Sequence, residues 1–234
     1  MEGVPPMRRP VQLSLSLREA PFFSNLSAPV VARIESFVHH RRYDSRQIIF
    51  FPYDPCDFVY WVRDGRVRVT RVSGDGRELS FRHLFPGDIL GEECLGGRSR
   101  RDDYAEALAP SLLCLMRSED YTRLMGEEVE LARAVARSLS SRVMDIEQVL
   151  AETVFNTVRS RVAAALIRLQ RPVGDVDPSV LRITHQEMAN LVGARRETTT
   201  ATLHELQKAG IVKIANRRII IKNQAALENV AQGG

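Results

Sequence analysis

The stretch of residues 184–212 constrains the fold more than any other part of this 234-residue chain, because it encodes two helices and the turn between them. Thr184, followed three residues later by Glu187, forms a capping box that predicts the start of the first helix. Gly193 stands where the chain must reverse, since glycine accepts a positive φ without steric cost. A second helix is expected from about Arg195 to Ala209. Two short helices joined by such a turn make a helix-turn-helix.

The second of these helices has one apolar and one polar face. Thr199, Leu203 and Leu206 share the apolar face, at the spacing that packs one helix against another. In a helix-turn-helix the polar face of the second helix enters the DNA major groove, where arginine pairs with guanine and glutamate accepts from cytosine. The alternative is a solvated face on which Arg196 and Glu197 form salt bridges. The candidate DNA contacts on this face are Arg195, Arg196, Glu197, Thr200 and His204.

A β-hairpin is expected directly after the second helix. Apolar runs at residues 211–214 and 218–221 flank a short polar turn, which is a hairpin pattern. Such a wing places Arg217 and Arg218 where they can contact phosphates, which fix register without reading sequence. Thr184, at the start of the first helix, completes the set of candidate contacts to double-stranded DNA. The wing favours DNA recognition over a solvated face.

The middle of the chain, residues 47–116, changes to a period of two. Its short runs are rich in β-branched and aromatic residues and are separated by glycine turns such as Asp64-Gly65. Many short strands at even spacing are typical of a small antiparallel barrel or roll. The expected strands are Ile48–Phe51, Phe58–Arg63, Arg66–Val72, Glu78–Phe85 and Leu112–Met116.

A long helix is expected after the strands, from about Glu127 to Thr153, with Ser118 capping a helix before it and Gly126 breaking the two apart. Its apolar residues step alternately by three and four, which is the heptad pattern of helices that wind about a partner. Packing against the chain's own strands is the alternative. A second apolar face, formed by Leu131, Val135 and Val149, can serve that packing and leave the first for a second copy. The candidate dimer interface is Ala136, Leu139, Val143, Ile146 and Leu150.

Composition and charge exclude several classes of protein. A net charge of +4 and a pI near 9.2 fit a nucleic-acid partner. No apolar run approaches the roughly 18 residues of a membrane span, and the N-terminus lacks the apolar core of a signal peptide, so a cytoplasmic protein is expected. Cys56, Cys94 and Cys114 stand far apart in the sequence, which argues against a disulfide framework, a zinc site or a four-cysteine iron–sulfur cluster. We expect buried, unreactive thiols.

The motifs, in their order and spacing, resemble the family of the cyclic-AMP receptor protein and the fumarate–nitrate regulator. The resemblance covers residues 22–227, and its strongest marks are Val62-Arg63-Asp64-Gly65-Arg66-Val67-Arg68-Val69, Pro86-Gly87-Asp88-Ile89-Leu90-Gly91-Glu92 and Arg196-Glu197-Thr198. It implies an α+β fold: a double-stranded β-roll of the cyclic-nucleotide-binding kind, a long dimerisation helix and a C-terminal winged helix-turn-helix. It also implies a homodimeric transcription regulator, an activator on a near-palindromic operator, with RNA polymerase as a further partner.

On this resemblance the chain divides into four parts. Residues 1–20 form an N-terminal tail and residues 21–126 the β-roll sensor domain. Residues 127–156 form the dimerisation helix and a hinge near Phe155. Residues 157–234 form the DNA-binding domain.

The resemblance also implies an effector site in the β-roll, for a cyclic nucleotide or another small anion. In nucleotide-binding relatives a Gly-Glu turn holds the cyclic phosphate, and an arginine followed by a hydroxyl residue comes about ten residues later. Here the arginine is followed by a carboxylate, which repels a phosphate, and Ile146-Glu147 stands where such relatives offer hydroxyls to the base. Cyclic AMP in its usual mode is therefore not expected. The candidate effector residues are Gly91, Glu92, Arg98, Arg101 and Asp102, with Arg100 completing a basic cluster.

Three alternatives stay open at this point. The regulator can be constitutive, with no effector, or controlled by thiol oxidation at Cys94. A metal-dependent β-roll enzyme is an alternative of another class, but such a site needs clustered histidine and carboxylate ligands. The five histidines (His39, His40, His83, His185 and His204) include no His-x-His in the expected strands, and His83 alone in a strand indicates a satisfied histidine rather than a haem ligand. No enzyme, metal or membrane is expected.

Overall fold

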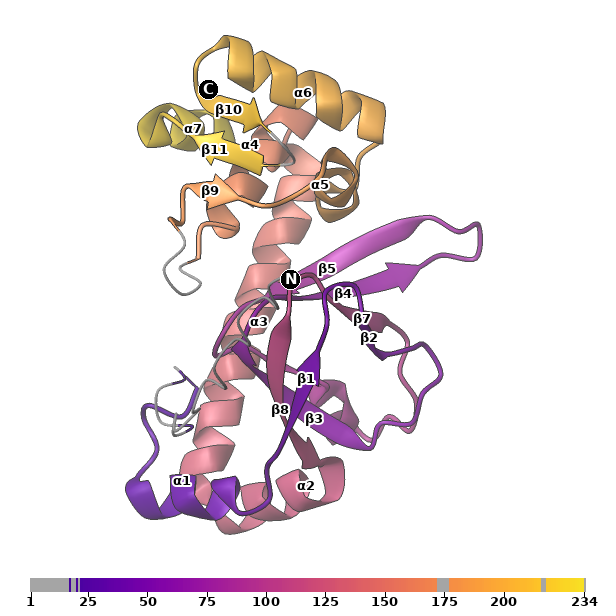
Figure 1. The fold of residues 1–234 in the computed structure, drawn as a ribbon, viewed down its shortest axis with the longest axis vertical. Coiled ribbons are helices and arrows are strands. Elements are labelled where there is room, and N and C mark those ends of the chain that lie inside the picture. Colours follow the sequence, from indigo (N-terminus) through magenta and orange to yellow (C-terminus); the bar gives the residue numbers. More distant parts are fainter. Residues whose placement is uncertain (1–16, 18–19, 21, 172–176, 216–217, 234) are drawn as a thin grey trace, which may run out of the picture.

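The computed structural model describes residues 17, 20, 22–171, 177–215 and 218–233. A β-roll and a smaller C-terminal domain lie at opposite ends of the molecule, and one long helix runs beside both (Figure 1). The fold is α+β, as the resemblance implies.

Two four-stranded antiparallel sheets form the roll after helix α1 (Ala28–Glu35). One sheet has the order β1-β8-β3-β6 and the other β2-β7-β4-β5. A 3-10 helix, η2 (Glu92–Gly96), connects β6 to the following strand. The strands are β1 (His39–Tyr43), β2 (Ile48–Phe50), β3 (Phe58–Asp64), β4 (Val67–Val72), β5 (Glu78–Leu84), β6 (Ile89–Leu90), β7 (Tyr104–Ala107) and β8 (Ser111–Arg117).

Alternation along β3 separates two hydrophobic cores. Tyr60 and Val62 face the interior between the sheets, whereas Val59 and Trp61 face the helices that cover the first sheet. Trp61 is 1% exposed and stacks edge-on against Tyr121 at 5.4 Å between ring centroids. That ring comes from helix α2 (Ser118–Glu127). The central strand thus anchors the roll and its helical cover at once.

Three strands of the roll were not predicted from the sequence. Strand β1 exposes four of its five residues and so lacks an apolar alternation, β6 has only two residues, and β7 (Tyr-Ala-Glu-Ala) has little β-branched character. Each is held by its neighbours in the sheet instead. Two helix-boundary predictions were also wrong. Ser118 is the first residue of α2 rather than its cap, and Gly126 lies inside that helix.

Helix α3 (Val129–Phe155) begins where Glu128 adopts an extended conformation. Its first turns pack on the roll, since Leu131 and Val135 are buried. Val149, predicted to share that face, is 37% exposed, so the packing against the roll ends earlier than the sequence indicated. Most apolar residues of the later turns are instead exposed. Those that are exposed are Leu139, Val143, Met144, Ile146, Val149, Leu150, Val154 and Phe155, and Ala136 is exposed too.

The C-terminal domain is a helical bundle with a three-stranded sheet of order β10-β11-β9. Neither β9 nor α7 was predicted, because one has two residues and the other follows the wing as a short alanine-rich segment. Within the described residues no helix combines the length and apolarity needed to cross a bilayer. The elements are α4 (Val158–Arg168), β9 (Val180–Leu181), α5 (His185–Val192), α6 (Arg196–Lys208), β10 (Val212–Ala215), β11 (Arg218–Ile221) and α7 (Gln224–Ala231).

Candidate functional site

The predicted helix-turn-helix is present in α5 and α6. The Thr184 hydroxyl accepts from the Glu187 amide at 3.2 Å, and the Glu187 carboxylate accepts from the Thr184 amide at 2.7 Å, which confirms the capping box. Gly193 has a φ of +63°, the left-handed conformation that the turn requires. The start of α5 and the reversal that follows it are therefore where the local sequence predicted them.

Helix α6 buries one face and exposes the other. Thr199, Leu203 and Leu206 are buried against the rest of the domain, as their spacing predicted. The helix lies at the end of the molecule opposite α1 and α2 (Figure 1). Its exposed guanidinium and carboxylate groups are free to meet the edges of bases in a major groove. The exposed residues at predicted positions are Arg195, Arg196, Glu197 and His204.

Thr200 differs from its neighbours on that face because it is half-buried. Its hydroxyl lies 3.1 Å from Nδ1 of His185, and the His185 ring meets that of His204 edge-on with centroids 6.1 Å apart. Burial, followed by the charges of His204 and Arg196, lowers the pKa of His185. Thr200 of α6 therefore contacts the first residue of α5, at the edge of the exposed face of α6. This contact was not predicted from the sequence.

The wing follows α6 as expected. Ile214 pairs with Ile219 and Ala215 with Arg218 across the antiparallel hairpin of β10 and β11. Arg218 is exposed at the tip side of this hairpin. Arg217, the other predicted phosphate contact, lies outside the described residues.

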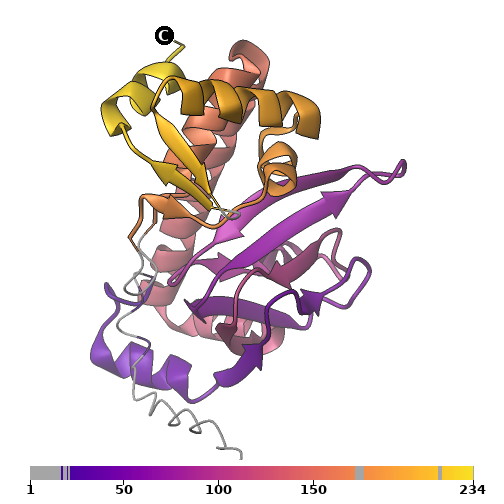
Figure 2. The same cartoon turned by 45° about the horizontal axis from the view of Figure 1, so that its top comes forward.

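The C-terminal domain docks on the hairpin of β4 and β5, with α5 beside β5 (Figure 1, Figure 2). Asn190 of α5 donates to the Glu78 carboxylate at 2.9 Å, and Arg66 donates to the backbone oxygen of Arg182 at 2.6 Å. Phe85, directly after β5, is 4% exposed and packs within the hydrophobic core of the C-terminal domain. The roll thus supplies a side chain to the interior of its neighbour.

His83 lies within this junction, on the strand that leads to Phe85. Both of its ring nitrogens are buried and have no hydrogen-bond partner among the described residues. Burial, with a smaller effect of Arg66 and Arg68, lowers its pKa to about 3. The sequence indicated a satisfied histidine, and that prediction was wrong because both ring nitrogens are removed from water and no described residue supplies a hydrogen-bond partner.

The predicted effector site centres on Gly91 at the start of η2. Its φ is +89°, and a Cβ at this position would lie 2.8 Å from the Phe58 carbonyl oxygen, so glycine is required there. Glu92 is 5% exposed, and its carboxylate accepts from Arg82 at 3.1 Å and from Arg142 of α3 at 2.8 Å. The turn is therefore tied to both β5 and the long helix.

Arg101 is buried beside this turn, with only 1% of its surface exposed. Its guanidinium donates to Glu93 at 2.6 Å and to the Phe58 carbonyl at 2.6 Å, and it lies 4.0 Å above the Phe50 ring centroid. A phosphate that bound Arg101 would have to displace the Glu93 carboxylate. The residues present do not fit a cyclic phosphate in this arrangement.

The basic cluster predicted beside the turn is not assembled. Arg98 pairs with Asp102 on the surface, Arg100 donates to the Tyr53 carbonyl at 2.8 Å, and Arg101 points inward. Asp102 also lies 3.7 Å from Arg71 of β4. These guanidinium groups diverge because each finds a closer partner within the chain.

Two of the cysteines come together beside η2. The sulfur atoms of Cys56 and Cys94 and a carboxylate oxygen of Glu93 all lie within 4.8 Å of one another. Burial, together with the nearby Cys94, raises the pKa of Cys56 to about 12, so this thiol is protonated at neutral pH. Cys114 is separate, buried on β8 with its sulfur 3.3 Å from Nδ1 of His40. Because Cys56 and Cys94 stand far apart in the sequence, their proximity was not predicted.

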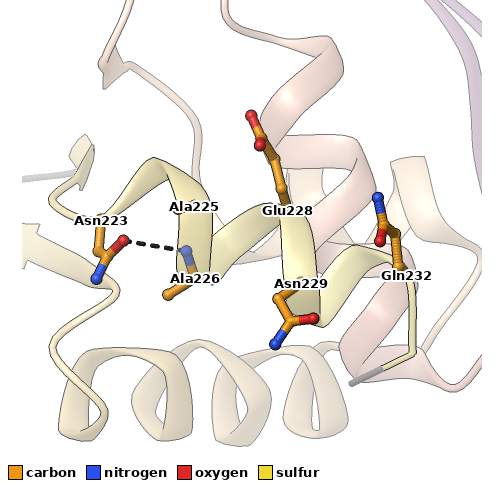
Figure 3. A pocket seen from close by; sticks show the side chains of 6 residues that line it. All are labelled: Asn223, Ala225, Ala226, Glu228, Asn229 and Gln232. Atoms are coloured by element: carbon orange, nitrogen blue, oxygen red, sulfur yellow. Dashed lines mark hydrogen bonds between the residues drawn. The ribbon is translucent and has the colours of Figure 1, made fainter.

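An open depression lies along α7 of the C-terminal domain (Figure 3). Asn223 caps this helix by accepting from the Ala226 amide at 3.0 Å. Among the side chains that line the depression only Glu228 is ionisable. The lining offers no convergent charges, so we assign it no ligand.

Comparison with known proteins matches both halves of the chain. The model of the cyclic nucleotide-binding domain matches residues 40–128, and that of the Crp-like helix-turn-helix domain matches residues 160–230. The first covers most of the roll and the second contains α5, α6 and the wing.

Similar proteins cover nearly the whole chain. The cyclic AMP receptor protein of Thermus thermophilus is 30% identical over 93% of this chain and 99% of its own length, and a global nitrogen regulator of Synechocystis sp. is 30% identical over 87% and 89%. The solved c-di-GMP responsive regulator CLP of Xanthomonas campestris is 26% identical with a TM-score of 0.73, covering 83% of this chain and 99% of that one. A solved regulator of the CRP/FNR family, also from Thermus thermophilus, is 27% identical with a TM-score of 0.71, covering 83% and 98%. The chain belongs to the cyclic-AMP receptor protein and fumarate–nitrate regulator family of transcription regulators.

Proposed function

We propose that the protein is a homodimeric, sequence-specific DNA-binding transcription regulator, acting in the cytoplasm, whose effector is not cyclic AMP in the usual mode. The exposed polar face of α6, held by a capped partner helix at the free end of the molecule, is the observation that carries the proposal. The contacts that we assign to DNA are those of the sequence prediction: Thr184, Arg195, Arg196, Glu197, Thr200, His204, Arg217 and Arg218.

The apolar stripe of α3 supports the dimer. Val143 is 53% exposed, Ile146 56% and Leu150 61%, at heptad spacing along a helix whose first turns pack on the roll. A contiguous apolar surface of this kind is favourable only when covered. A second copy of the same helix matches its length and chemistry. The proposed interface comprises Ala136, Leu139, Val143, Ile146 and Leu150.

The contacts of Arg101 in the β-roll support an effector other than cyclic AMP. Two relatives carry names that refer to cyclic AMP or c-di-GMP, whereas here Arg101 is buried against Glu93. A carboxylate already occupies the position at which an anionic effector would meet that arginine. The effector is therefore another small molecule, or the protein regulates through its abundance alone.

Regulation would pass through the elements that join the domains. Glu92 links η2 to Arg142 on α3, while Asn190 and Phe85 hold the DNA-binding domain on the β4–β5 hairpin. An effector shifts such an equilibrium only by binding one arrangement better than the other. RNA polymerase is the further partner that an activator would contact.

Selection from random double-stranded oligonucleotides tests the DNA-binding proposal, with the oligomeric state measured in parallel by sedimentation. We expect an enriched near-palindrome and a dimer. No enrichment, together with a monomer at working concentrations, would contradict the proposal. Calorimetric titration with cyclic mononucleotides and dinucleotides tests the effector statement, for which we expect no binding of cyclic AMP at the concentrations that activate its receptors.

A further inference from the structure

Three side chains that the proposed DNA-binding function does not use meet at η2: Glu93 and Cys94 belong to this short helix, and Cys56 comes from the segment before β3. Cys56 is buried, and Glu93 and Cys94 are half-buried, with one potential ligand atom from each within 4.8 Å of the others. Two sulfur atoms and a carboxylate oxygen at this separation are potential ligands for one metal ion. The spacing of the cysteines in the sequence did not predict this cluster.

The backbone around these ligands is held from several sides. The Cys56 amide donates to the Ser99 carbonyl at 3.1 Å, and its carbonyl accepts from the Ser118 hydroxyl at 2.7 Å. The Cys94 amide donates to the Gly91 carbonyl at 3.2 Å within the short helix. Both segments of the site are thus fixed before any ligand arrives, which favours binding over a flexible pair of thiols.

We propose that Cys56, Glu93 and Cys94 bind one divalent metal ion of the zinc class. Thiolate sulfur selects soft or borderline ions, and zinc accepts two sulfur ligands together with a carboxylate and a water molecule in tetrahedral geometry. Zinc–sulfur bonds of about 2.3 Å place two ligand atoms on the order of 4 Å apart, which is compatible with the observed cluster. Binding does not depend on the DNA-binding proposal.

The charge of the cluster accommodates a divalent ion. Cysteine binds a metal as thiolate, so coordination releases thiol protons to solvent. Two thiolates, the Glu93 carboxylate, one divalent ion and the neighbouring Arg101 guanidinium then sum to zero charge, so the occupied site carries no net charge for desolvation to penalise.

The site lies next to the contact that joins the roll to the long helix. Glu93 pairs with Arg101, and the preceding residue, Glu92, accepts from Arg142 of α3 at 2.8 Å. A metal that binds Glu93 in place of Arg101 therefore affects η2, the short helix that also carries Glu92.

Cobalt titration of the reduced full-length chain tests the proposal, because cobalt substitutes for zinc and absorbs when thiolates bind it. We expect a thiolate-to-cobalt charge-transfer band that saturates at one ion per chain and disappears when zinc is added. Cys56→Ser and Cys94→Ser should each reduce the band at least by half, and Glu93→Gln should weaken cobalt binding about tenfold, while Cys114→Ala should leave the titration unchanged.

A thermal melt with and without zinc provides a readout that does not rely on absorption. Zinc should raise the melting temperature of the unaltered chain but not that of Cys94→Ser, whose half-buried position tolerates the change. The proposal is overturned if the reduced chain binds no cobalt. It is equally overturned if both serine variants keep the full band, or if oxidation forms a Cys56–Cys94 disulfide in a chain whose reduced form takes up no metal.

Discussion

Arg196 stands at the first turn of α6 with its side chain exposed, where a guanidinium can present two donors to the edge of one guanine. A bidentate contact of this kind discriminates between bases, whereas a phosphate contact does not. The role of this residue can therefore be separated from general attraction between the protein and DNA.

Replacing this residue, Arg196→Ala, should cost roughly 1–3 kcal/mol of affinity for the selected operator and relax the preference at one base pair. Competition band-shift assays with operator variants measure both effects. Lys208→Ala, at the far end of the same helix, serves as the control and should preserve the preference. A uniform loss on every sequence would assign Arg196 to phosphate contact instead.

The buried ring of His83 predicts a dependence of stability on pH. Its folded-state pKa of about 3 lies below the ordinary value of 6.5, so the unfolded chain takes up the proton first as pH falls. The stability that the neutral ring provides is complete above about pH 6.5 and is lost progressively between pH 6.5 and 3. Urea unfolding of the unaltered chain should show this loss, and His83→Gln should make it shallower. His39→Gln, on the exposed strand β1, should follow the unaltered chain.

At the scale of the element, α3 is asymmetric along its length: its start is buried against the roll and its later turns are exposed. The buried residues Leu131 and Val135 lie on a different face from the exposed heptad stripe. The stripe on the later turns is the surface that we assign to the dimer.

A charge in the centre of that stripe tests the assignment. Ile146→Glu should convert the dimer to a monomer, because two copies of the carboxylate would face each other in an apolar interface. Sedimentation velocity measures the change, with circular dichroism to show that the helix persists. Ser141→Glu, exposed on the other side of the helix, should remain dimeric. A dimeric Ile146→Glu variant would place the interface elsewhere.

One aromatic side chain, Phe85, adds apolar packing to the polar contacts between the roll and the C-terminal domain. Phe85→Ala should lower the free energy of unfolding by about 3–5 kcal/mol, since loss of a buried ring leaves a cavity in the core it shares with α4 and α6. Phe81, four residues earlier on β5, is 46% exposed, so Phe81→Ala should have a much smaller effect. Urea denaturation compares the two. Equal effects would mean that Phe85 contributes no more to the core than an exposed ring does.

At the scale of the whole molecule, α3 connects the roll at one end to the DNA-binding domain at the other (Figure 1). In the proposed dimer each protomer presents one α6, and the two helices enter successive major grooves on the same side of the duplex. Two-fold symmetry of the protein then requires two-fold symmetry of the operator.

The spacing of the operator halves tests this arrangement. Half-sites should lie about 34 Å apart, one helical turn of DNA. Inserting about half a turn of base pairs between them should reduce affinity to that for a single half-site, because the second half then faces away from the dimer. Band-shift titrations of the spaced operators measure the loss. Affinity that does not change with spacing would show that the halves are bound independently.

The sequence by itself determined the features that arise within one or two turns of chain. The capping box at Thr184, the reversal at Gly193 and the buried face of Thr199, Leu203 and Leu206 all follow from local rules of hydrogen bonding and helical periodicity. Five strands of the roll and the long helix were predicted for the same reason. The strands that were not predicted, β1, β6 and β7, have no such pattern in their sequence. Pairing with neighbouring strands holds them in the sheets.

Only the tertiary structure decided which distant groups meet. It buried both ring nitrogens of His83 without a partner, placed Phe85 in the core of the C-terminal domain and brought Cys56 beside Cys94. These contacts depend on how strands pair and how domains dock, and no periodicity in the sequence encodes the identity of a partner that lies tens of residues away. Charge and burial at each of these positions follow from that packing, because a polar group takes the nearest partner that folding places within its reach.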